Sequence, residues 1–165
     1  MSLRANALAA RLETGAALLA EFAERLSEAE WNTRVRDGRT VGIVVHHVAS
    51  VYPLEIELAR TIAAGKPVAG VAWENVADMN AQHAREHAAV SKSATLALLR
   101  QNSQEAAAAV RRFTDLELDT AAPFSLCYDA PMTAQFVLED HAVRHAWHHL
   151  ERVRAALAGA RPAAA

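Results

Sequence analysis

The N-terminal segment carries apolar side chains at helical spacing, and this periodicity constrains the fold more than any other feature. Large apolar residues recur three, four and seven positions apart, at Leu8, Leu12, Leu19, Phe22 and Leu26. This spacing places them on one face of a helix, which we predict from about residue 4 to about residue 29. Because such a stripe must be buried against other elements, the pattern predicts a packed helical domain.

Similar patterns, separated by turn signals, predict a second helix. Asp37-Gly38 is typical of a turn, and Thr40 is placed to cap a helix that begins at Val41. Pro53 lies inside this pattern, so we expect the helix to kink or end there. The glycines and proline between residues 65 and 70 predict a loop.

Two more helices are expected in the C-terminal half. The third should run from about Trp73 to about Asp115, either unbroken or in two parts. The stretch from Thr120 to Pro131 has no periodicity, which predicts a loop. Pro131 then suits the first turn of a fourth helix that extends to about Ala158.

The composition favours helix throughout the chain. Alanine is abundant, whereas the 165 residues include only 6 glycines and 5 prolines. Four amphipathic helices bury their stripes most economically as an antiparallel four-helix bundle. We therefore predict an all-α fold with a single domain over residues 1–159 and a frayed tail over residues 160–165.

Charge and cysteine content narrow the classes of partner. The formal net charge is −2 without a basic patch, which argues against nucleic acid and anionic membranes as partners. No run of about 18 apolar residues predicts a membrane span. The single cysteine, Cys127, excludes an intramolecular disulfide. These features favour a cytoplasmic protein that binds a small molecule.

The eight histidines are the strongest functional signal, because six of them fall into two tight groups. The fourth helix contains His141, His145, His148 and His149. At about 100° per residue, His145 and His149 border the predicted apolar stripe, whereas His141 and His148 turn away from it. Two histidines four apart on one helix face can bind one ion, so the predicted inward pair is His145 with His149.

A tetrahedral ion needs a third ligand from another element. His47 lies within the apolar stripe of the second helix, while His46 is about 100° away and faces another side. Three neutral imidazoles would leave one coordination position open for water or substrate. The alternative for His47 is a hydrogen bond to a core carbonyl.

The third helix offers a rival pair, because His83 and His87 are also four apart. They could form a second site or replace the pair on the fourth helix. A fourth protein ligand such as Asp140 or Glu86 would close the site and favour a structural ion. Neither the Glu-x-x-His motifs of di-iron bundles nor the metalloprotease motif His-Glu-x-x-His occurs.

Three segments together resemble the DinB/YfiT-like superfamily of metal-binding proteins, over roughly Trp31 to Ala155. They are Asp37-Gly38-Arg39-Thr40-Val41 leading to His47-Val48, then Asp78-Met79-Asn80, and then His145-x-x-x-His149 followed by Leu150-Glu151-Arg152-Val153. Two positions depart from the usual pattern. Tryptophan is frequent in the family where Arg39 stands, and Gly-Gln is frequent where Glu151-Arg152 stands.

The resemblance implies a bundle with up-down-down-up topology, often dimeric, that holds a divalent ion such as zinc or nickel. The family's ligand positions correspond to His47, His145 and His149. Three imidazoles also suit iron or copper. The resemblance further implies a transferase or isomerase that uses a low-molecular-weight thiol, such as bacillithiol, mycothiol or glutathione. Two alternatives are a hydrolase in which the ion activates water, and a non-catalytic or stress-related bundle whose ion is structural.

Overall fold

Four long helices form the core of the computed structural model, which describes residues 2–160. They are α1 (Leu3–Glu24), α3 (Val41–Ala63), α5 (Lys92–Val110) and a C-terminal helix made of α7 (Ala134–Val137), a π-helical segment η2 (Leu138–Val143) and α8 (Arg144–Ala160). The predicted all-α four-helix bundle is confirmed. The frayed tail predicted for residues 160–165 lies outside the described residues, except for Ala160 at the end of α8.

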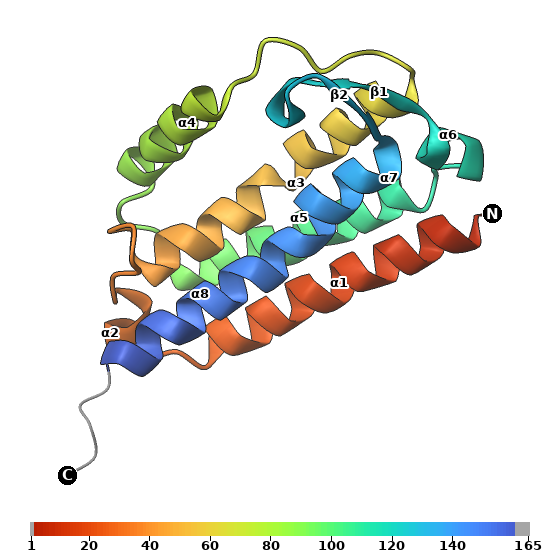
Figure 1. Ribbon diagram of the computed structural model, residues 1–165. Coiled ribbons are helices and arrows are strands. Elements are labelled where there is room, and N and C mark those ends of the chain that lie inside the picture. Colours follow the sequence, from red (N-terminus) through yellow and green to blue (C-terminus); the bar gives the residue numbers. More distant parts are fainter. Residues whose placement is uncertain (1, 161–165) are drawn as a thin grey trace.

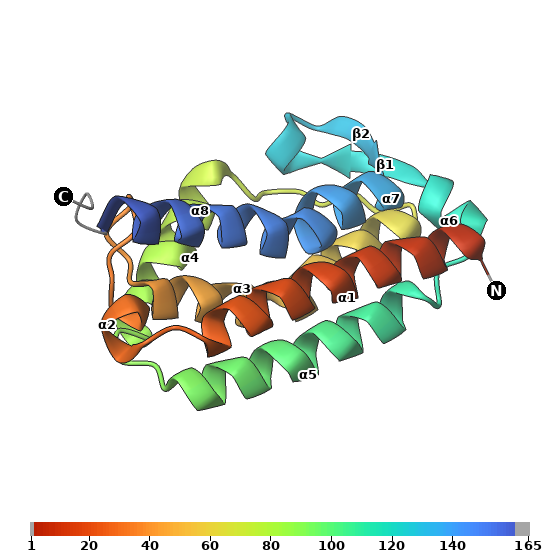
Figure 2. The same ribbon diagram turned by 90° about the horizontal axis from the view of Figure 1, so that it is seen from below.

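The helices run up, down, down and up. Figures 1 and 2 show α1 and α8 running in one direction and α3 and α5 in the opposite one. Each of α3 and α1 packs against both α5 and α8, so the four helices surround one apolar core. This is the topology that the family resemblance implies.

This topology requires a long connection, because α3 and α5 point the same way. After α3 the chain returns along the bundle through residues 64–91, which include α4 (Trp73–Glu86). Figure 1 shows α4 outside the bundle, beside the N-terminal half of α3. The predicted third helix is therefore two helices, of which only α5 belongs to the core.

The first predicted helix is too long. It ends at Glu24, and a short helix α2 (Glu28–Trp31) follows it. Ser27 starts α2 with a capping box, because its hydroxyl accepts from the Glu30 N–H while the Glu30 carboxylate accepts from the Ser27 N–H. This local capping competes with continuation of the first helix. Pro53 does not end α3, which continues for ten further residues to Ala63.

The stretch predicted as a loop contains a β-hairpin. After a short helix α6 (Asp115–Asp119), strands β1 (Ala121–Phe124) and β2 (Ala130–Thr133) pair antiparallel around a 3₁₀ turn. Pro131 lies in β2, so its predicted place in the first turn of the fourth helix is wrong. That helix begins instead after Thr133, whose hydroxyl accepts from the Phe136 N–H.

The core is apolar except for a few polar side chains. Among the described residues, the buried polar side chains are His47, Glu55, Thr95, Ser103 and His149. α3 is long and apolar enough to span a membrane by composition, but 61% of its most apolar window is buried within the bundle. It is the central helix of the core. Three of the buried polar side chains lie close together, and they define the candidate site.

Gly42 allows a close contact that fixes the entry into α3. A Cβ atom at this position would lie 2.5 Å from Nε1 of Trp31, whose N–H donates to the Val90 carbonyl at 3.2 Å. We expect Gly42→Ala to lower the free energy of unfolding by about 1–2 kcal/mol. Overpacking costs about 1–3 kcal/mol. The higher helix propensity of alanine relative to glycine offsets at most about 1 kcal/mol of this cost.

Urea unfolding of Gly42→Ala beside Gly159→Ala tests this expectation. At Gly159, which is also helical, no atom of the described residues beyond its chain neighbours and the backbone of its own helix lies within 4 Å of a built Cβ. The Gly159→Ala control should therefore be as stable as the wild type or slightly more stable. A Gly42→Ala protein with wild-type stability would contradict the packing described here.

Candidate metal centre

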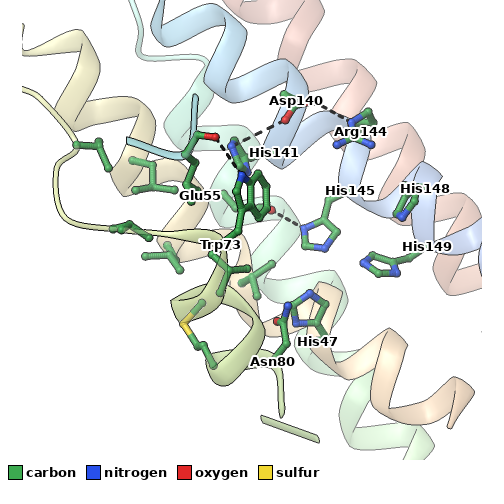
Figure 3. A pocket seen from close by; sticks show the side chains of 18 of the residues that line it. His47, Glu55, Trp73, Asn80, Asp140, His141, Arg144, His145, His148 and His149 are labelled. Atoms are coloured by element: carbon green, nitrogen blue, oxygen red, sulfur yellow. Dashed lines mark hydrogen bonds and ion pairs between the residues drawn. The ribbon is translucent and has the colours of Figure 1, made fainter. Parts of the chain in front are cut away.

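Three imidazoles from two helices meet between α3 and α8, in the wall of a cavity that α4 helps to line, and we call them the first triad. His47 comes from α3, and His145 and His149 come from successive turns of α8. One ring nitrogen from each lies within 4.8 Å of the others. Figure 3 shows the three rings around one space. The structure thus brings together the three residues that the sequence singles out as ligands.

Burial keeps two of these rings neutral. His47 and His149 are only 7% and 5% exposed. Burial, together with the neighbouring His145, lowers the pKa of His47 to about 3 and that of His149 further. Nδ1 of His149 is buried, and among the described residues it has no hydrogen-bond partner. Neutral imidazoles with an unsatisfied nitrogen suit a divalent cation, which needs deprotonated ligands.

Glu55 fixes the orientation of the third ring. It lies two turns after His47 on α3, is 4% exposed, and its carboxylate hydrogen-bonds Nδ1 of His145. A carboxylate in this place makes Nδ1 the donor and leaves Nε2 of His145 free as a ligand atom. Sequence reasoning missed Glu55. The available signal was an acidic residue in the apolar stripe of α3, eight positions after His47.

The first triad forms part of the wall of a cavity of about 420 Å³. Most of the remaining wall is apolar. It comes from α3, from the connection between α3 and α5 (residues 64–91, which we call the crossover) and from the hairpin. These apolar residues are Val51, Leu54, Leu58, Val68, Val71, Trp73, Val76, Met79 and Leu126. Asn80, which lies in one of the motif segments, also lines the cavity. A cavity of this size accommodates a small molecule with an apolar body.

The two positions that depart from the family pattern meet at the rim of this cavity. Arg39 and Arg152 both line it, and both donate to Oδ2 of Asp37, at 2.8 and 2.6 Å. Burial alone would raise the pKa of Asp37, but these hydrogen bonds outweigh it and hold the pKa well below its usual range. Nη1 of Arg39 is also buried, and no described residue forms a hydrogen bond with it.

His141 does not turn away from the site as predicted. It lines the cavity, its side chain is 18% exposed, and burial lowers its pKa. The physical reason is the π-helical segment that contains it, because a wider turn shifts the phase of all preceding residues relative to α8. His148 is exposed, in keeping with its predicted outward direction, although it also contributes to the cavity rim.

The rival histidines of α4 fall outside the first triad, although the ring centroid of His83 lies 5.5 Å from that of His47. His83 and His87 lie beside His46 of α3, and these three residues form a separate group of possible ligands, which we call the second triad. The carboxylates considered as closing ligands are paired with other side chains, although Asp140 lines the same cavity. Asp140 pairs with Arg144 at 3.0 Å, and Glu86 accepts from Gln82 at 2.7 Å. Among the described residues, neither triad includes a carboxylate.

The lowered pKa values predict acid sensitivity of the metal-free protein. His47 and His149 stay neutral in the folded state, but in the unfolded state they take up protons below about pH 6.5. The free energy of unfolding should therefore fall as the pH decreases from about 6.5, by about 1 kcal/mol per pH unit for each histidine. Urea midpoints between pH 7.5 and 5, above the range in which carboxylates protonate, measure this dependence. A constant midpoint would contradict it.

Comparisons with known proteins agree with this architecture. The model of the DinB superfamily matches residues 11–153. The solved structure of YfiT from Bacillus subtilis, described as a probable metal-dependent hydrolase with an unusual four-helix bundle topology, superimposes with a TM-score of 0.74. The two sequences are 21% identical, and the match covers 96% of this chain and 89% of that one. No curated protein sequence matches significantly. With the family model spanning most of its length, this chain is a member of the DinB superfamily.

Proposed function

We propose that this protein is a metal-dependent enzyme whose ion is held by His47, His145 and His149 and acts on a small molecule in the adjoining cavity. The observation that carries the proposal is the position of the first triad in the wall of that cavity. A purely structural ion is expected to have a closed set of protein ligands. In the described part of this chain, three protein ligands converge, and the cavity adjoins them.

The chain's own residues prepare the site in three ways. Burial keeps His47 and His149 neutral, and Glu55 holds the ring of His145. The apolar wall excludes water around a bound substrate. A divalent ion with three neutral ligands keeps its full charge, and it would favour ionisation of a thiol or water in its open coordination position.

A low-molecular-weight thiol is our first candidate for the group that is activated, which makes the protein a thiol-dependent transferase or isomerase. The arginines at the rim support a ligand with an anionic group. One buried nitrogen of Arg39 has no partner in the described part of the chain, and Arg39 and Arg152 both line the cavity. Guanidinium groups suit carboxylates, which glutathione and bacillithiol both carry. The apolar wall would then receive the second substrate.

Hydrolysis is the second candidate, with water in place of the thiol. The observation in its favour is the structural similarity to YfiT, which is described as a probable metal-dependent hydrolase. The same three ligands and the same cavity would serve this reaction. A homodimer and a cytoplasmic location are further proposals that rest on the family resemblance and on composition.

Cobalt-loaded protein distinguishes these candidates. We would use a variant in which His83 and His87 are alanine, so that only the first triad can hold cobalt. For a transferase, glutathione or bacillithiol should change the visible and near-ultraviolet absorption of cobalt, and an electrophile should then be consumed in proportion to the metal content. For a hydrolase, nitrophenyl esters should be cleaved without any thiol.

The matched control is the same protein with His145 and His149 also replaced by alanine, which should show neither effect. If cobalt binds to the first triad but no thiol changes its spectrum and no ester is cleaved, the enzymatic proposal is wrong. The ion would then be assigned a structural role.

A further inference from the structure

The second triad joins the crossover to the bundle. His46 projects from α3 toward α4, where His83 lies in the last turn and His87 follows as the C-terminal cap. One ring nitrogen from each of the three lies within 4.8 Å of the others. The ring centroid of His87 is 4.0 Å from that of His46 and 4.5 Å from that of His83. Three imidazoles from two separate elements therefore gather at one point.

Hydrogen bonds among these rings do not account for the arrangement. Nδ1 of His46 lies 2.9 Å from Nε2 of His83, which is also 3.3 Å from the Ser50 hydroxyl. The other nitrogen of His83, Nδ1, is buried and has no hydrogen-bond partner within residues 2–160. A neutral imidazole has one N–H donor and one lone pair, so the bond between His46 and His83 uses one nitrogen of each ring and leaves Nδ1 of His83 unpaired among the described residues.

The spacing suits a cation. Zinc–nitrogen bonds of about 2.0–2.1 Å at tetrahedral angles place two ligand nitrogens about 3.3 Å apart. Nδ1 of His46 and Nε2 of His83 are 2.9 Å apart, which is slightly less than this ligand spacing. A small outward movement of α4 would therefore admit the ion. Imidazole ligands without carboxylates favour zinc or a similar transition metal over calcium or magnesium.

α4 is weakly attached to the rest of the molecule. None of its residues is buried, although Val76 and Met79 line the cavity. Its N-terminal end is fixed by a hydrogen bond from the Trp73 indole to the Leu126 carbonyl at 3.1 Å. Its C-terminal end meets α3 at the histidines. Little apolar surface holds α4 in place. A metal at this end would therefore supply a large share of the free energy that holds α4 against the bundle.

We propose that His46, His83 and His87 bind a second divalent ion of the zinc type, which fastens α4 to α3 and thereby fixes one wall of the cavity. The two triads adjoin, since the rings of His47 and His83 are 5.5 Å apart. They nevertheless consist of different residues, so each can be removed by itself. This inference does not depend on the activity proposed above.

Metal content provides the first test. Full-length protein is saturated with zinc, freed of excess ion by gel filtration and analysed for metal. We expect about two ions per chain in the wild type, and about one in both His83→Ala/His87→Ala and His145→Ala/His149→Ala. His148→Ala is the control, because it removes an exposed histidine, and it should retain about two ions per chain. Far-ultraviolet circular dichroism checks that each variant is folded.

The outcomes separate the two sites. A single ion in the wild type that persists in His83→Ala/His87→Ala would overturn the second site. A single ion that is lost in that variant but kept in His145→Ala/His149→Ala would support the second site and contradict the proposed enzymatic centre.

Hydrogen–deuterium exchange tests the fastening of α4. Zinc should slow amide exchange in α4 of the wild type and of His145→Ala/His149→Ala, and this protection should be absent in His83→Ala/His87→Ala. Exchange in α4 that does not respond to zinc in any variant would overturn this part of the inference.

Discussion

Replacing His47, His145 and His149 together by alanine is expected to abolish the stabilisation of this protein by metal at the first triad. An ion that binds only the folded state stabilises it according to its concentration relative to the dissociation constant. At about 1,000 times that constant the gain is about 4 kcal/mol. To isolate this effect, both proteins should carry alanine at His83 and His87. The parent should then gain about 4 kcal/mol from zinc, and the triple variant almost nothing.

Thermal or urea unfolding with and without zinc measures this difference. The metal-free triple variant supplies an internal check, because it lacks the buried histidines that make the parent acid-sensitive. Its stability should fall less between pH 7 and pH 5 than that of the parent. If zinc stabilises parent and triple variant equally, the ion binds elsewhere and the first triad is not a metal site.

Glu55→Gln is expected to weaken metal binding by about 10- to 100-fold, although Glu55 is not a ligand. Glutamine keeps the size of the side chain and an oxygen that can accept from Nδ1 of His145. It removes the negative charge that strengthens the imidazole as a ligand and fixes its tautomer. The effect should therefore appear in the affinity for zinc, and the overall fold should be retained.

Competition with a chromophoric chelator gives the dissociation constant of each variant. Glu57→Gln is a matched control, because Glu57 lies on the same helix but is exposed and pairs with Arg60 at 3.3 Å. It should bind zinc as the wild type does. Equal affinities for Glu55→Gln and the wild type would show that the Glu55–His145 hydrogen bond serves only the packing of the core.

The ligand set could be predicted because its geometry is local. His145 and His149 both lie in α8, where regular helical spacing holds, and His47 lies in an unbroken stretch of α3. Counting about 100° per residue is valid within such segments. The same count fails for His141, which lies in η2. Nothing in the apolar spacing shows that the chain adopts a wider turn there, because the count assumes a regular α-helix.

The hairpin and Glu55 could not be predicted for other reasons. Pro123 and Pro131 face each other across the two strands, and prolines argue against strands because they cannot donate hydrogen bonds. The hairpin is held instead by contacts distant in sequence, such as the bond from the Val68 N–H to the Pro123 carbonyl at 3.0 Å. Glu55 meets His145 ninety positions later in the chain. Such pairings follow from the tertiary fold, which periodicity does not describe.

The parallel course of α3 and α5 has a consequence for how proteins of this architecture can diverge. Any chain with this topology needs a long return segment, and here that segment supplies part of the cavity wall through α4. Because α4 buries no residue, substitutions on it can reshape the cavity at little cost to folding. Substitutions on α3 and α8, which carry the first triad, would cost more folding free energy, because many residues of these helices are buried. Evolution and protein engineering can therefore alter ligand preference through α4 while the metal-binding framework stays unchanged.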